Sequence, residues 1–361
     1  MPEIHQDRLL LAGRHPLAAV VSAALAERAR ADRGLLLAVS GGPDSLALLW
    51  LVAAVVRRAG GGRVRVGHID HGLRPESAHE AAKVAQWSAD AGLHADMVRI
   101  EGLAAAPGNR LAAAREARYE ALFQLAAGHG LTAVVTAHHR EDQAETIVMG
   151  LGRGMGLHGA AGMRRERLTN SGIALLRPLL GVSRNDLGAF CRALGLEPID
   201  DPSNRDARRL RGRLRDSLLP QFEEVLPGFA AGLERLSTES ELALAAIERW
   251  LEASLGPVTR RRWSRSELRE LPVELVAMGL RRSVRENFPA TGEAPRRIWT
   301  AIAEAALDHE QAPRRWSIDE GVRIEVTAAE VAVLAAEEPS LTVGVQPESR
   351  GVDQAARQAS T

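Results

Sequence analysis

The residues with the clearest chemical potential form a short run, Ser40-Gly41-Gly42-Pro43-Asp44-Ser45, between an apolar segment and an expected helix. Two adjacent glycines let the backbone turn tightly and point successive N–H groups to one side. The N-terminus of the following helix adds a partial positive charge, and the two serine hydroxyls can donate further hydrogen bonds. The run therefore predicts a nest for a phosphate or pyrophosphate. It differs from both the lysine-bearing P-loop and the Gly-x-Gly-x-x-Gly pattern.

Two runs further along the chain carry histidines and carboxylates. The first is His68-Ile69-Asp70-His71, in which Asp70 is a candidate to bond a ribose or an adenine. The second begins at His138-His139 and continues to Asp142 and Glu145, which share one helix face at i, i+3 spacing. Paired carboxylates suit an ammonium group or Mg²⁺. The alternative is a charged first helical turn that complements the helix dipole. The four histidines of these runs are candidates for phosphate contact or metal-linked roles. For at least two of them we favour the alternative, a hydrogen-bonded cap or core contact.

Arginines are densest in the polar run 200–215. The cluster comprises Arg205, Arg208, Arg209, Arg211, Arg213 and Arg215. Such a strip predicts contacts to RNA phosphates. A second cluster, Arg260-Arg261-Arg262, either touches RNA or forms a solvated face.

The first half of the chain alternates expected strands and helices. The strands are predicted at 35–40, 63–70, 94–100, 131–136 and 174–180, and the helices at 44–57, 76–91, 109–127, 141–151 and 183–194. This alternation predicts an α/β fold with a parallel, Rossmann-like sheet. Ligands of such sheets sit beyond the carboxyl ends of the strands. The glycine loop and both histidine runs follow strands, so we expect them to converge on one crevice.

The second half has a different pattern. Helices are predicted at 237–255, 267–287 and 295–309, followed by a small β hairpin at 315–319 and 322–327. No element is predicted in the glycine-rich stretch 150–162. We expect a catalytic domain over residues 1–220, a mainly helical domain over 221–337 and a flexible tail over 338–361.

Composition narrows the class of protein. The chain has 361 residues, 45% of them hydrophobic, and a formal net charge of zero, so bulk basicity does not point to a nucleic-acid partner. The single cysteine, Cys191, excludes an internal disulfide or a Cys-rich cluster within the chain. No apolar run approaches the ~20 residues that span a bilayer, and the N-terminus lacks the order of a signal peptide. We therefore expect a cytoplasmic protein without a membrane segment.

Several linked motifs resemble the tRNA(Ile)-lysidine synthase family, within the N-type ATP pyrophosphatase (PP-loop) superfamily. The motifs are residues 40–45, 68–74, 114–119, 136–146, 177–180 and 201–204, and the resemblance spans residues 34–220. It departs from the family pattern at three positions: Glu141 stands for the usual aspartate, Gly212 for an asparagine and Asp216 for a histidine.

The resemblance implies an RNA-modifying ligase. ATP would adenylate the C2 oxygen of the wobble cytidine in an isoleucine tRNA with a CAU anticodon, releasing pyrophosphate. The side-chain amine of L-lysine would then displace AMP. The second domain would grip the tRNA, and dimerisation, common among relatives, is an expectation.

The resemblance also assigns the site residues. The implied catalytic residues are Asp44, Asp142 and Arg115. The implied ATP-binding residues are Ser40, Gly41, Gly42, Pro43, Asp44, Ser45, His68 and Asp70. Lysine would be held by Asp142 and Glu145 at its ammonium end and by Arg115 at its carboxylate. Mg²⁺ would be steered by Asp44 or Asp142, and the arginine strip would contact tRNA.

Two alternatives remain open from the sequence. One is a relative with another acceptor, such as a tRNA-thiolating, NAD-forming or XMP-amidating enzyme. Sulfur transfer usually requires catalytic cysteines, and Cys191 stands alone in an expected helix; a glutamine-hydrolysing domain is not visible either. The other alternative is a nucleotide- or RNA-binding module without turnover.

Overall fold

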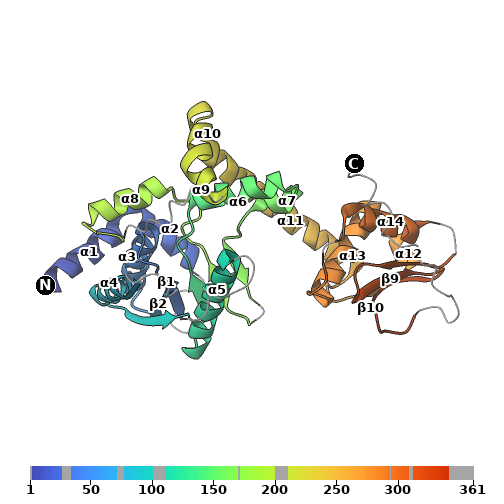
Figure 1. The fold of residues 1–361 in the computed structure, drawn as a ribbon, viewed down its shortest axis with the longest axis horizontal. Helices are drawn as coiled ribbons and strands as arrows, with labels where there is room; N and C mark the ends of the chain where they lie inside the picture. The colour runs from blue at the N-terminus through green and yellow to red at the C-terminus, as the bar shows by residue number, and fades with distance from the viewer. Residues whose placement is uncertain are drawn as a thin grey trace. The chain divides into compact units, whose positions relative to one another are not determined.

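The chain folds into two compact units, Met1–Leu242 and Ala243–Thr361. The computed structural model describes residues 2–26, 34–70, 77–100, 110–169, 171–199, 210–292, 294–308 and 312–340. The division falls inside the long helix α11, Phe229–Leu255 (Figure 1). The domain boundary at 220/221 stays a prediction.

The first unit contains a six-stranded sheet in the order β3-β2-β1-β4-β6-β5. Its strands are β1 (Leu35–Ala38), β2 (Val64–Asp70), β3 (His94–Arg99), β4 (Ala133–Val135), β5 (Glu166–Leu168) and β6 (Ala174–Leu176). Neighbouring strands pair in parallel, except that the edge strand β5 runs antiparallel to β6. The predicted parallel α/β sheet is confirmed. The antiparallel edge strand was not predicted, because its three residues are all exposed and carry no burial pattern.

Helices cover both faces of this sheet (Figure 1). They are α1 (Pro2–Arg14), α2 (Pro16–Leu25), α3 (Pro43–Arg58), α4 (Ser77–Asp90), α5 (Arg110–Gly128), α6 (Arg140–Gly152), α7 (Gly156–Ala161) and α8 (Arg184–Ala193). Helix α3 packs against α1, α2 and α8 and is buried from Ser45 to Val56. Helix α5 packs against β1, β2 and β4 on the opposite face, through Leu122 and Ala126. The short helix α7 lies in the stretch for which no element was predicted.

The carboxyl edge of the parallel strands gathers the residues of chemical interest. Strand β1 leads into the 40–45 loop, β2 ends at Asp70, and β4 is followed by His138 and His139. Strand β6 is followed directly by Arg177. The sheet therefore brings these segments to one edge, as the strand pattern predicts.

The rest of the first unit is helical. Helix α9 (Leu210–Arg213) continues into a π-helix (Leu214–Leu218), then α10 (Leu219–Val225) and the start of α11. The π-helix contacts α6, and Leu219 and Leu233 pack on Ala144 and Ile147 of that helix. This packing places the arginine-bearing segment 210–218 against the helix that carries Asp142 and Glu145.

The second unit combines an antiparallel sheet with helices. The sheet has the order β7-β10-β9-β8, with β7 (Arg262–Ser264), β8 (Arg314–Ser317), β9 (Val322–Val326) and β10 (Glu330–Ala335). The helices are α12 (Arg265–Leu268), α13 (Val273–Asn287) and α14 (Arg296–Leu307). The predicted hairpin corresponds to β8 and β9, and β10 and β7 extend it to a four-stranded sheet. Strand β7 was missed because three residues, one of them arginine, give no periodic signal. No helix in the described ranges is both long and apolar enough to cross a membrane.

Candidate active site

The 40–45 loop is held in shape by one hydroxyl group, that of Ser45. Its Oγ accepts hydrogen bonds from the Gly41 N–H (3.1 Å) and from Ser40 Oγ (3.3 Å), and donates to the Gly42 carbonyl (2.9 Å). The Gly41 carbonyl in turn accepts from the backbone N–H of Ile199. One N–H group of the expected phosphate nest is therefore bonded inside the loop, and it shapes the loop rather than facing a ligand.

Glycine is required at position 41 for two reasons. Its φ of +95° lies in the left-handed region, and a Cβ there would lie 2.6 Å from Ile199 Cδ1. Gly42 caps α3 with Pro43 in its first turn, the position where the fixed φ of proline fits a helix. Asp44 follows in the same turn.

His139 connects the loop to the acidic residues of α6. Its Nε2 lies 3.6 Å from Asp44 Oδ2 and 3.4 Å from Asp142 Oδ2. Its Nδ1 lies 2.9 Å from Glu141 Oε2. Burial opposes the charged imidazole, but the hydrogen bond with Glu141 and the nearby carboxylates outweigh it and raise the pKa of His139. The neighbouring carboxylates therefore favour the charged form of His139.

Asp44 has one buried carboxylate oxygen that is available to a ligand. Burial raises the pKa of Asp44, although the charge of His139 opposes this rise. Its Oδ1 is buried and has no hydrogen-bond partner among the described residues. A cation would satisfy this oxygen. The described residues contain no cluster of three or more His, Cys, Asp or Glu that could hold a metal alone. Mg²⁺ usually takes one or two carboxylates together with substrate phosphates and water, so Asp44 fits it.

Asp142 and Glu145 lie together, as their spacing predicts, and Arg215 lies between them. Arg215 Nε and Nη2 donate to the two carboxylate oxygens of Glu145 at 2.7 and 3.1 Å, and Nη2 also reaches Asp142 Oδ1 at 3.2 Å. Glu145 is completely buried, whereas 18% of the Asp142 side chain is exposed. Burial raises the pKa of Glu145 against the influence of Arg215. The predicted ammonium pocket thus already holds one cation of the chain itself.

The remaining carboxylate contacts fix the start of α6. Asp142 Oδ2 accepts from the backbone N–H of His139 at 3.2 Å, which caps the helix. Glu141 Oε2 accepts from the backbone N–H of Arg184 at 2.9 Å. Burial opposes ionisation of Asp142 and Glu141, but these partners lower the pKa of both. Both side chains are therefore carboxylates at neutral pH.

His138 lies between the Asp142 carboxylate and three arginines. Burial lowers its pKa to about 3; the charge of Asp142 opposes this shift, and the charges of Arg177, Arg115 and Arg118 add to it. Its Nδ1 lies 2.8 Å from Thr136 Oγ1. His138 is therefore neutral at pH 7, and its pKa is shifted in the opposite direction to that of His139. Arg115 lies on α5, with its guanidinium 5.2 Å from the centre of the Tyr119 ring.

The two residues predicted on β2 have structural partners. His68 is buried and its Nδ1 lies 2.8 Å from the Val39 carbonyl. Asp70 Oδ2 accepts from Ser77 Oγ at 3.1 Å. His71 lies outside the described residues. A direct role of His68 and Asp70 at a nucleotide stays a prediction.

The arginine strip is only partly described. Arg205, Arg208 and Arg209 lie outside the described residues. Arg211 donates to Thr146 Oγ1 at 3.3 Å, and Arg213 is exposed. In the second cluster, each of Arg260, Arg261 and Arg262 forms an ion pair with a glutamate. This favours a charged surface for residues 260–262.

Sequence reasoning missed three members of this neighbourhood. Arg215 was expected at RNA, and Arg118 and Arg177 received no role. Arg215 lies 70 positions from Glu145 in the chain, so no local spacing could have paired them. Arg118 and Arg177 do lie inside the motifs at 114–119 and 177–180, and that placement was the available signal.

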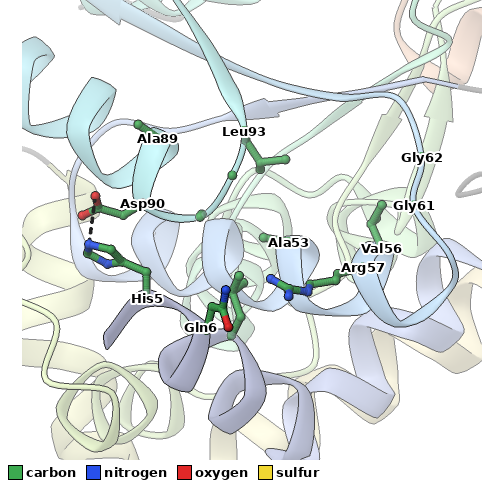
Figure 2. A pocket seen from close by; sticks show the side chains of 13 residues that line it. His5, Gln6, Ala53, Val56, Arg57, Gly61, Gly62, Ala89, Asp90 and Leu93 are labelled. Atoms are coloured by element: carbon green, nitrogen blue, oxygen red, sulfur yellow. Dashed lines mark ion pairs between the residues drawn. The ribbon is translucent and has the colours of Figure 1, made fainter. Parts of the chain in front are cut away.

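A cavity of about 530 Å³ lies elsewhere, where α3 and α4 end (Figure 2). It is lined by His5, Arg57, Asp90 and neighbouring residues, and Figure 2 shows His5 directed at Asp90, 3.4 Å away. None of the predicted site residues lines it. The predicted site residues lie instead at the carboxyl edge of the sheet, in the 40–45 loop and on α6.

Comparisons with known proteins show which family the chain resembles. A family model described as a PP-loop domain matches residues 16–222. The chain is 47% identical over 226 residues to the tRNA(Ile)-lysidine synthase of Novosphingobium aromaticivorans, covering 61% of this chain and 67% of that relative. It is 38% identical over 349 residues to the tRNA(Ile)-lysidine synthase of Rhodopseudomonas palustris, covering 92% of this chain and 97% of that relative.

One solved structure is similar in fold. The U34-tRNA thiolase NcsA from Methanococcus maripaludis with its [4Fe-4S] cluster superposes with a TM-score of 0.52 at 16% identity. The match covers 62% of this chain and 78% of that chain. At this identity the likeness shows the α/β fold alone.

Proposed function

The chain belongs to the tRNA(Ile)-lysidine synthase family of PP-loop proteins, and from that premise we propose how its residues carry out the ligation. It is an ATP-dependent carbon–nitrogen ligase. It joins L-lysine to C2 of the wobble cytidine of the CAU-anticodon isoleucine tRNA, through an adenylated intermediate, and releases pyrophosphate and AMP. The observation that carries the proposal is that Asp44 of the loop and Asp142 of α6 both approach Nε2 of His139. The two half-reactions thus share one site.

In the first step the 40–45 loop binds the pyrophosphate end of ATP. Negative charge builds on the leaving pyrophosphate as the bond to the α-phosphorus breaks. Backbone N–H groups at the N-terminus of α3 are fixed in place to meet that charge, which is the arrangement that lowers a barrier most. Ser45 acts by holding the loop in this shape.

Asp44 is the proposed protein ligand of Mg²⁺, through the buried oxygen that lacks a partner. A magnesium ion bound there would neutralise phosphate charge during adenylation. His139 holds the other oxygen of Asp44.

In the second step lysine binds at the acidic pair. The two carboxylates share the single guanidinium of Arg215, and Asp142 is the one that stays partly exposed. Glu145 is fully buried and both its oxygens are bonded to Arg215. We therefore assign direct contact with the lysine ammonium to Asp142. Glu145 acts by holding Arg215, and Arg115 receives the carboxylate of lysine. The amine must lose a proton before it attacks C2.

The proposal also covers which residues contact the tRNA, the compartment in which the protein acts and its oligomeric state. Residues 1–220 supply the chemistry, and the strip at 205–215 together with residues 221–337 contacts the tRNA. A splayed wobble base requires such phosphate contacts around it. The cytoplasm is the proposed compartment, because ATP, lysine and tRNA meet there. A homodimer stays a prediction.

Sulfur transfer is not favoured as an alternative. Cys191 is buried and its Sγ lies 3.4 Å from the Pro43 carbonyl. Burial raises the pKa of Cys191 to about 12. A thiol with that pKa is a poor nucleophile at neutral pH.

Labelled lysine tests the proposed function. The full chain is incubated with ATP, Mg²⁺, labelled lysine and a CAU-anticodon isoleucine tRNA transcript. Lysine should enter the RNA with one pyrophosphate and one AMP released for each. Label that enters equally from glutamine or a sulfur donor would favour another acceptor chemistry. Tight ATP binding without pyrophosphate release would favour a non-catalytic module.

A further inference from the structure

Three arginines at the carboxyl edge of the sheet have no acidic partner among the described residues. Arg115 and Arg118 lie on α5, with their guanidinium carbons 5.2 and 5.5 Å from the centre of the Tyr119 ring. Arg177 follows β6. Within the described part of the chain none of the three forms an ion pair, whereas Arg140 and Arg215 beside the acidic site do. Contacts with an aromatic ring orient the guanidinium groups without neutralising them.

Arg177 is the one of the three that is buried and has an unsatisfied N–H group. Only 7% of it is exposed. One nitrogen, Nη1, donates to the Arg164 carbonyl at 2.7 Å, but the buried Nε has no hydrogen-bond partner among the described residues. Burial lowers the pKa of Arg177; the neighbouring Tyr119 side chain opposes this shift, and the positive charges of Arg167 and Arg115 add to it. An anion would satisfy the free N–H and relieve the repulsion.

The position of the cluster indicates which anion. The phosphate-binding loop follows β1 and leads into α3, on one face of the sheet. The arginines lie on α5, on the other face, and at the end of β6. His138, whose charge state they influence, links them to the Asp142 side of the site. The cluster therefore lies on the acceptor side rather than on the pyrophosphate side.

We propose that Arg118 and Arg177 bind a phosphate group of the RNA substrate next to the target cytidine. A nucleotide that is splayed out of its loop carries a phosphate on each side, and these must enter the site with it. Arg115 remains for the carboxylate of lysine, so three unpaired cations meet two anions. The assignment rests on the proposed function, since it takes the RNA as the acceptor.

The test measures RNA binding separately from catalysis. Binding of the tRNA transcript is measured by filter retention at several salt concentrations for the wild type, R118Q and R177M. R57Q is the control, because it removes one exposed arginine from the opposite edge of the sheet. KM values for ATP and lysine are measured on the same proteins. R118Q, which changes a half-buried side chain, decides the matter if R177M does not fold.

R118Q and R177M should each weaken tRNA binding about tenfold, the usual effect of one lost charge-assisted contact. The slope of log affinity against log salt should fall by about 1. R57Q and the KM values should not change. A raised KM for lysine or ATP with unchanged RNA affinity would overturn the proposal, and so would no change at all. If the wild type binds RNA but incorporates no lysine, the proposed function fails, while the RNA comparison still decides the phosphate site.

Discussion

Arg215 clasps Glu145 through two hydrogen bonds, Nε to Oε1 at 2.7 Å and Nη2 to Oε2 at 3.1 Å. The pair joins the π-helix at 214–218 to the middle of α6. Glu145 is completely shielded from water, so its charge depends on this one partner. A π-helix inside a helical segment often marks a functional site. Here it turns Arg215 toward the acidic pair.

Removal of Arg215 should destabilise the fold. R215A leaves a buried carboxylate without its partner, which costs about 3 kcal/mol of the free energy of unfolding. The double variant R215M/E145M should recover most of that loss, because neither charge remains. Urea unfolding of R215M, E145M and R215M/E145M measures the coupling. R213A, which changes an exposed arginine two positions earlier, should cost less than about 0.5 kcal/mol. Losses that simply add in the double variant would mean that the pair is not coupled.

The two carboxylates should differ in their effect on lysine. D142N removes the partly exposed carboxylate and should raise the KM for lysine about tenfold or more, as expected for a lost charge-assisted contact. E145Q should lower the unfolding free energy and change the KM for lysine much less. Steady-state kinetics with lysine as the varied substrate separates the two. An equal rise of the lysine KM in a folded E145Q protein would contradict the assignment of direct contact to Asp142.

Ser45 should matter for ATP through the shape of its loop. S45A removes the acceptor of the Gly41 N–H and the donor to the Gly42 carbonyl. We expect the KM for ATP in pyrophosphate release to rise about tenfold, the effect of one or two lost buried hydrogen bonds. S88A is a matched control, since Ser88 is also a buried helical serine but bonds only the Val84 carbonyl in α4. Equal KM values for ATP in S45A and S88A would contradict the role of Ser45 in shaping the ATP-binding loop.

The Cys191 thiol should be unreactive toward thiol reagents in the native protein and dispensable for catalysis. Because burial raises its pKa to about 12, the thiol stays protonated at pH 8 and would ionise only as the pH approaches 12. A thiol reagent should therefore label the unfolded protein and leave the native protein unlabelled at pH 8. C191A should retain lysine incorporation. Rapid native labelling together with loss of activity in C191A would return sulfur transfer to consideration.

Elements and site residues could be predicted from the sequence where the pattern that indicates them lies within a few neighbouring residues. The glycine loop, the alternation of strands and helices and the i, i+3 pair of Asp142 and Glu145 each depend on neighbouring residues, and the structure has them together. Contacts between distant segments could not be read in this way. The segment with Arg215 was assigned to RNA because it is basic, yet its guanidinium is held by carboxylates 70 and 73 positions away.

Local patterns also failed where burial gives no alternation. Strands β5 and β7 have three residues each and include exposed charged side chains. The contact of the His68 ring with the carbonyl of Val39, which follows the neighbouring strand β1, was also not predicted, and a role of His68 at a nucleotide stays a prediction. Only the register of β1 and β2 places these two groups together.

The most direct test of the shared site is lysine incorporation with a changed wobble base. Wild-type protein is given ATP, labelled lysine and two isoleucine tRNA transcripts that differ only at the first anticodon position, with cytidine or with uridine. Our account predicts incorporation into the cytidine transcript alone, and its loss in D44N and in D142N. Incorporation that is independent of the wobble base, or unchanged in both variants, would contradict it.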